Sequence, residues 1–110
     1  MLCQSGVWKG NSVKGLGLGG ETWHNPPRSV NANYVNSFSF PIMVTYSFPD
    51  TGAQNPISVV YVDGVALSAL NFDSGTYFGT TQGSFIVPPG SSYQIHNSIG
   101  QQANVWAELY

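Results

Sequence analysis

Hydrophobic and polar residues alternate along the segment 41–48, "PIMVTYSF". Apolar side chains occupy every second position from Ile42 to Phe48. A period of two indicates a β-strand that buries one of its faces. Other short stretches rich in strand-forming residues follow, and no stretch has a helical period. The further predicted strands are "ETWHN" at 21–25, "ANYVN" at 32–36, "SFIV" at 84–87, "SYQIHN" at 92–97 and "NVWAELY" at 104–110.

Two more strands follow from the segment 57–70, "ISVVYVDGVALSAL". Its centre is Asp63-Gly64, a pair that suits the positive backbone angles of a two-residue type I′ turn, so the segment predicts a hairpin. The chain then has about seven short strands separated by turns. This pattern predicts an all-β fold, an antiparallel β-sandwich of jelly-roll-like form.

Glycine and polar residues mark the segments outside these strands. Residues 1–20 hold six glycines and no periodic pattern, which indicates a linker or junction to an upstream part. Residues 21–110 then form the β-sandwich domain. Within it, 71–83 is polar, rich in glycine and aromatic, and predicts a long loop, whereas 49–56 consists of turn formers.

Composition excludes several classes of function. Charged residues make up 7% of the 110 residues, against roughly 25% in an ordinary soluble domain. The three cations, Lys9, Lys14 and Arg28, are too few to follow a nucleic-acid backbone or to form a basic membrane-binding face. No apolar run approaches the ~20 residues of a transmembrane helix, and the start lacks a signal-peptide pattern. A neutral polar surface favours an extracellular β protein.

The acidic residues offer little for catalysis. Asp63 belongs to its predicted turn, and Asp50 lies in a Pro-Asp-Thr-Gly turn. Asp73 and Glu108 form a conceivable acid pair for glycoside hydrolysis, but separated carboxylates in a β protein are usually surface residues. The sequence therefore favours a protein that is not an enzyme.

The histidines and the cysteine do not suggest a metal or cofactor site. His24 and His96 would supply two ligands, which do not fill a zinc site, and each is expected to hydrogen-bond a turn instead. Cys3 is the one cysteine of the chain, and a flexible terminus supplies no pocket that lowers a thiol pKa. We predict no metal and no cofactor.

Aromatic side chains in the predicted loops are the best candidates for a binding surface. A sugar presents C–H groups to a flat ring and hydroxyls to short polar side chains, and loops with Tyr, Asn, Asp and Gln supply both. Two alternatives stay open: Tyr77 and Phe78 cap one end of the sandwich, or they pack against a neighbouring subunit. Trp23 and Trp106 lie in strands, which favours the core or a subunit interface. The candidate glycan-binding residues are Phe48, Asp50, Gln54, Asn71, Asp73, Tyr77, Phe78 and Gln82.

Five segments occur in a fixed order: "GGETWHN", "PRSVNANYVNSFSFPIMV", "VDGVAL", "FIVPPGSSYQI" and "VWAELY". Together they resemble the C-terminal domain of phage tail-fibre proteins over about residues 19–110. The chain departs from that pattern at Asn31-Ala32, where Gly-Thr is common, and at Tyr110, where Arg is common. The matching residues are Trp23, Asn25, Arg28, Tyr34, Asn36, Pro41, Ile42, Val44, Phe85, Ile86, Val87, Pro88, Gly90, Tyr93, Trp106, Glu108 and Leu109.

The opening stretch "LCQSGVWKG" resembles a second family, the PilV-type tip adhesins of conjugative type IV pili. In these minor pilins a shared body ends in a Cys-x-x-Gly-x-Trp stretch, and shufflon rearrangement attaches alternative C-terminal segments, some of them tail-fibre-like. The resemblance implies a trimeric β-sandwich that recognises lipopolysaccharide on a recipient bacterium. It also implies that Cys3 has its partner in the upstream pilin body.

These observations predict an extracellular, non-catalytic adhesin that binds lipopolysaccharide glycan during mating-pair formation. Specificity is expected on the segments 47–56 and 71–83, about which the tail-fibre pattern says little. Three alternatives stay open: a phage tail-fibre tip that binds host glycan, a structural trimerisation cap without a ligand, and a hydrolase or deacetylase of glycans.

Overall fold

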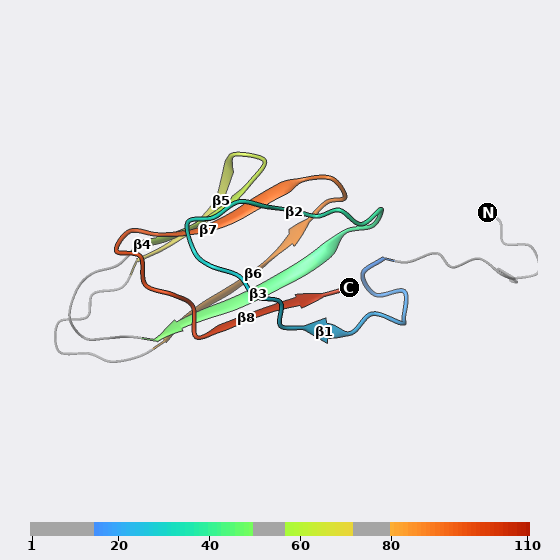
Figure 1. Cartoon of the computed structure of the whole chain (residues 1–110), viewed down its shortest axis with the longest axis horizontal. Coiled ribbons are helices and arrows are strands. Elements are labelled where there is room, and N and C mark those ends of the chain that lie inside the picture. The colour runs from blue at the N-terminus through green and yellow to red at the C-terminus, as the bar shows by residue number, and fades with distance from the viewer. Residues whose placement is uncertain (1–14, 50–56, 72–79) are drawn as a thin grey trace, which may run out of the picture.

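The computed structural model describes residues 15–49, 57–71 and 80–110, which form a sandwich of two four-stranded sheets (Figure 1). The strand order is β1-β8-β3-β6 in one sheet and β2-β7-β4-β5 in the other, and neighbouring strands are antiparallel. This is the strand order of a jelly roll, so the predicted fold class is confirmed. The strands are β1 Trp23–His24, β2 Tyr34–Val35, β3 Ile42–Pro49, β4 Ile57–Val62, β5 Val65–Asn71, β6 Thr80–Val87, β7 Ser92–Asn97 and β8 Val105–Leu109.

The core lies between the two sheets and is built from alternate residues of each long strand. β3 occupies the interior of its sheet, paired with β6 on one side and β8 on the other. The alternation predicted from Ile42 to Phe48 is confirmed, because every second side chain of that run is buried. Together with Val30, the strands supply the core residues Ile42, Val44, Tyr46, Phe48, Val60, Val62, Phe85, Val87, Tyr93, Ile95 and Trp106.

The predicted hairpin is confirmed as β4 and β5. Asp63 has φ 53° and Gly64 has φ 80°, the positive angles that a type I′ turn requires. The turn is attached to β7, because the Asp63 carboxylate accepts hydrogen bonds from Ser91 Oγ (2.7 Å) and from the Ser92 N–H (3.0 Å). These two bonds, the one from Ser91 above all, lower the pKa of Asp63.

β6 is longer than the sequence predicted. Residues 80–83 were expected in a loop, but they pair with β3, and Gly83 lies opposite Tyr46. A Cβ added at Gly83 would lie 2.8 Å from the Tyr46 hydroxyl and 3.1 Å from the ring carbon that bears it. The Tyr46 ring is 2% exposed and packs edge-on to Phe48 and Phe85, so it has little room to shift. A glycine at 83 therefore makes space for a core tyrosine.

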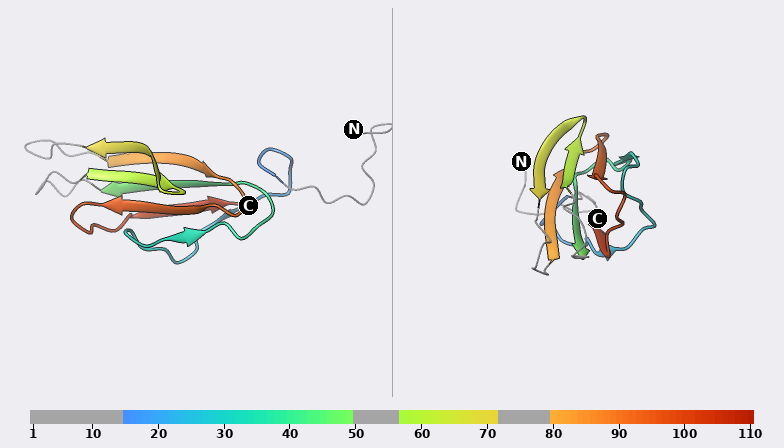
Figure 2. Two further views of the ribbon diagram at one scale, coloured as in Figure 1. Left: turned by 90° about the horizontal axis from the view of Figure 1, so that it is seen from above. Right: turned by 90° about the vertical axis from the view of Figure 1, so that its left-hand side faces the viewer.

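The start of the described chain and its C-terminal residue lie together at one end of the sandwich (Figure 1). Thr22 and Tyr110 exchange two backbone hydrogen bonds of 2.9 and 3.1 Å. Just before them, the Glu21 carboxylate accepts hydrogen bonds from the backbone N–H groups of Gly17 and Gly19. Residues 15–21 are therefore held against the domain, and the long strands lead away from this end along the length of the molecule (Figure 2).

The part of the chain that the structure describes holds no helix long and apolar enough to cross a membrane.

Candidate functional site

Most of the predicted glycan-binding residues lie outside the described residues. These are Asp50, Gln54, Asp73, Tyr77 and Phe78. The strand ends that flank the two segments are placed, however: Pro49 pairs with Thr80 in one sheet, and Ile57 pairs with Asn71 in the other. Both segments therefore join the two sheets, and glycan binding by these five residues stays a prediction.

The structure separates the other three predicted residues. Phe48 is a core side chain with 0% exposure, so it has no face to offer a sugar, and its prediction as a binding residue is wrong. The alternation of β3 turns it inward, against Tyr46. Gln82 is exposed on β6, whereas Asn71 is the last residue of β5 in the other sheet.

A buried ionic network joins the two sheets around Glu108. The Glu108 carboxylate, on β8, accepts hydrogen bonds from Tyr93 Oη of β7 (2.7 Å) and from Trp106 Nε1 (3.1 Å). Arg28 donates two more, from Nε at 3.1 Å and from a terminal nitrogen at 3.3 Å. The Arg28 guanidinium lies 4.5 Å above the centre of the Tyr34 ring. The expectation that Glu108 is a surface residue is wrong, since it is 1% exposed.

Two members of this network, Tyr93 and Arg28, have raised pKa values. Burial, then the hydrogen bond and the charge of Glu108, raise the pKa of Tyr93, because the phenolate would be desolvated beside a carboxylate. Burial disfavours the Arg28 charge, but Glu108 outweighs this effect and raises the pKa of Arg28. Four donors occupy the Glu108 oxygens, so this carboxylate is committed to structure and is poorly placed to accept a substrate proton.

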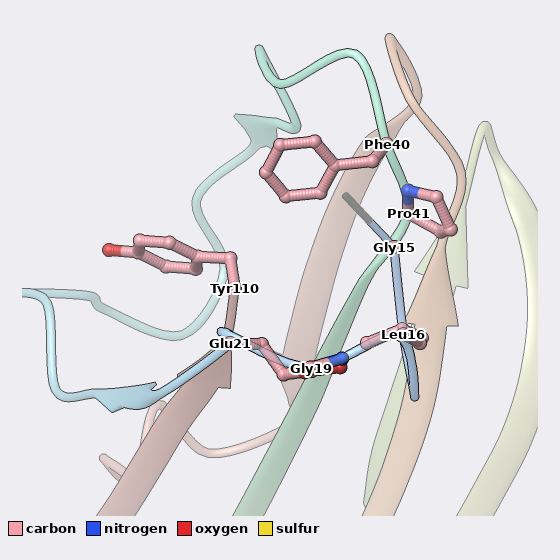
Figure 3. A pocket seen from close by; sticks show the side chains of 7 residues that line it. All are labelled: Gly15, Leu16, Gly19, Glu21, Phe40, Pro41 and Tyr110. Atoms are coloured by element: carbon pink, nitrogen blue, oxygen red, sulfur yellow. The ribbon is translucent and has the colours of Figure 1, made fainter. Parts of the chain in front are cut away.

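A column of four aromatic rings closes the end of the sandwich beside this network. His24 is parallel to Tyr110 at 3.9 Å, and Phe38 follows at 4.7 Å from Tyr110, with Phe40 at 4.9 Å from Phe38. Figure 3 shows Phe40, Tyr110 and Glu21 around a cavity of about 10 Å³ at this end. A second hollow of about 180 Å³ reaches from Phe38 to Glu108. Because neighbouring rings cover the inner faces of the column, this end offers little flat surface for a ligand.

A wider groove lies where β4, β7 and the Asp63-Gly64 turn meet. Its volume is about 410 Å³, within the range of about 300–1,000 Å³ typical of ligand sites. Tyr61 and Gln94 are cross-strand partners on the face of the sheet opposite the core. Asn33 precedes β2. The groove is lined by Asn33, Tyr61, Gly64, Ser92, Tyr93 and Gln94.

The chemistry of this groove is that of a site for a neutral polar ligand. Within the described parts of the chain, the side chains of Asn33, Tyr61 and Gln94 make no hydrogen bond to protein atoms. Two amides and one phenol supply donors and acceptors without charge, and the tyrosine adds an aromatic surface. The sequence did not predict this site because Tyr61 lies within a predicted strand and has no feature that marks it as a binding residue. Its pairing with Gln94 depends on the tertiary structure.

The described residues do not assemble a metal site, since no group of three His, Cys, Asp or Glu side chains comes together among them. His24 lies on β1 of one sheet and His96 on β7 of the other. The Nε2 atom of His24 is 3.3 Å from Thr22 Oγ1, two residues earlier in the chain, so this contact is local.

No family model matches the sequence, and no curated protein matches it either. Among solved structures, the chain is similar to the C-terminal domain of EclA, described as a sugar-binding protein. The two are 10% identical, and the match covers 81% of this chain and 72% of the other, with a TM-score of 0.41.

Proposed function

We propose that this chain is a non-catalytic module that binds glycan through the groove at Tyr61. The observation that carries the proposal is the set of three uncharged side chains in that groove, Asn33, Tyr61 and Gln94, which have no hydrogen-bond partner among the described residues. A pyranose ring would stack on Tyr61 while the two amides bind its hydroxyls. The saturated hydrogen bonds of Glu108 support the non-catalytic part of the proposal.

The finer proposal is that the glycan belongs to bacterial lipopolysaccharide and that the module is an extracellular adhesin. Its support is the sequence resemblance to tail-fibre C-terminal domains and, at residues 1–10, to conjugative pilus tip adhesins. On this proposal the module contacts a recipient cell during mating-pair formation.

Replacing Tyr61 with alanine is expected to weaken binding of lipopolysaccharide polysaccharide by about 1–3 kcal/mol, or about five- to 150-fold in Kd. The loss follows from removal of both the stacking surface and the hydroxyl. Isothermal titration with purified polysaccharides from several strains measures it. The Tyr61→Phe variant keeps the ring and is expected to lose less.

Two outcomes would contradict this proposal. If Tyr77→Ala or Phe78→Ala abolishes binding while Tyr61→Ala leaves it unchanged, the site lies on the 71–83 segment instead. If the wild-type protein binds no polysaccharide of the panel, glycan binding itself is wrong. Thermal unfolding of each variant controls for loss of the fold.

A trimer is the assembly we propose for this module. On the outer face of the β1-β8-β3-β6 sheet, the cross-strand partners Trp23, Leu109, Met43 and Ile86 form an apolar row, in which Trp23 is 52% exposed and Ile86 49%. An exposed apolar row of this kind is suited to contact with another subunit. Light scattering at micromolar concentration is expected to give three times the chain mass, and Ile86→Lys is expected to lower it. A wild-type monomer would contradict the trimer.

A further inference from the structure

We infer that Asp63 makes the Tyr61 groove select neutral over anionic glycans. The inference rests on the proposed function and adds the class of ligand. Asp63 is next to Gly64 and is hydrogen-bonded to Ser92, and both of these residues line the groove. A carboxylate at this edge places a negative charge beside any ligand that the groove holds.

The charge is fixed in position. The Asp63 side chain accepts hydrogen bonds from Ser91 Oγ at 2.7 Å and from the Ser92 N–H at 3.0 Å, and its own N–H donates to the Ser92 carbonyl at 2.9 Å. With two bonds to Ser91 and Ser92, the carboxylate cannot swing away when an anionic ligand arrives. The bond from Ser91, and then the bond from the Ser92 N–H, lower the pKa of Asp63, so the charge persists into mildly acidic solution.

No Lys or Arg side chain of the described residues lines the groove. Arg28 is the one Lys or Arg side chain among them, and it is committed to Glu108 between the sheets. The lining side chains themselves are uncharged. A carboxylate or phosphate on the glycan would therefore be repelled by Asp63, with no Lys or Arg at the groove to offset the repulsion. A hydroxyl in the same place carries no charge and would not be repelled.

The test compares each polysaccharide with its own charged derivative. The probes are neutral polysaccharide chains from lipopolysaccharides of several strains, each also oxidised at its primary hydroxyls to carboxylates. Wild-type protein is expected to bind the oxidised form about three- to tenfold more weakly than the neutral form, and less so at high salt, where surface charges are screened.

The decisive variant is Asp63→Asn. Asparagine tolerates the positive φ of this turn and can still accept the bond from the Ser92 N–H, so the fold is kept. The Asp63→Asn variant is expected to bind the neutral chains as the wild type does and to lose most of the discrimination against the oxidised chains. Glu21→Gln removes an equal charge elsewhere in the domain. This control variant is expected to discriminate between neutral and oxidised chains as the wild type does.

The outcomes separate the inference from the proposed function. Equal discrimination in the wild type and in Asp63→Asn would overturn the role of Asp63, and so would wild-type protein that binds both forms equally. Absence of binding to every neutral chain would overturn the proposed function, and the inference with it.

Discussion

The Glu108→Ala variant is expected to lose about 3–5 kcal/mol of its free energy of unfolding, because the partly buried Arg28 charge and two buried hydrogen-bond donors lose their partner. Arg28 would lose both bonds to the carboxylate, while the Tyr93 hydroxyl and the Trp106 N–H would lose their acceptor. Denaturant unfolding followed by tryptophan fluorescence measures the loss, since Trp106 contacts the carboxylate directly.

Two controls make this prediction specific. The double variant Arg28→Met, Glu108→Leu removes both charges and is expected to recover much of the stability, since apolar residues often replace a buried ion pair at little cost. The variant Glu21→Gln, at a carboxylate held by backbone N–H groups of an exposed turn, is expected to change stability far less. A loss below about 1 kcal/mol in Glu108→Ala would show that the network contributes little.

Phe48→Ala is expected to destabilise the fold by about 3–5 kcal/mol, the usual effect of deleting a buried aromatic side chain. The ring is 0% exposed and packs against Tyr46, so its removal leaves a cavity between the sheets. Thermal and denaturant unfolding measure the effect. Leu67→Ala, at a side chain that is 50% exposed on β5, is the matched control and is expected to cost much less.

The same variant separates a core role from a binding role. Under conditions where Phe48→Ala is folded, it is expected to bind the wild-type's polysaccharide with unchanged affinity. A variant that keeps its stability and loses binding would restore Phe48 to the glycan site and contradict its place in the core.

The sequence pattern predicted most of the strands because burial of one face imposes a period of two on the long strands. The run from Ile42 to Phe48 shows this, and so does the hairpin with its Asp63-Gly64 turn. The start of β6 was missed because "TTQG" has no apolar alternation. Its Gly83 has no side chain to signal burial, and the space is filled by Tyr46 from the neighbouring strand.

Several of the residues that carry the tail-fibre resemblance hold the two sheets together. Arg28, Tyr34, Tyr93, Trp106 and Glu108 meet in one network between the sheets. Such a pattern describes how the sandwich is held together, and it leaves the binding surface free to differ. This fits a groove whose key side chains, Tyr61 and Gln94, are not among the residues that match the pattern.

By itself, the sequence determined the all-β class, the positions of most strands and the uncharged character of the surface, because these follow from local periodicity and composition. Only the tertiary structure decided that Glu108 is a buried anchor, that Phe48 is core and that Tyr61 meets Gln94 in a groove. Each of these depends on which distant strands become neighbours, and the pairing of β4 with β7 joins residues more than 30 positions apart. The local sequence pattern does not encode which distant strands pair, because that is decided when the two sheets close on each other.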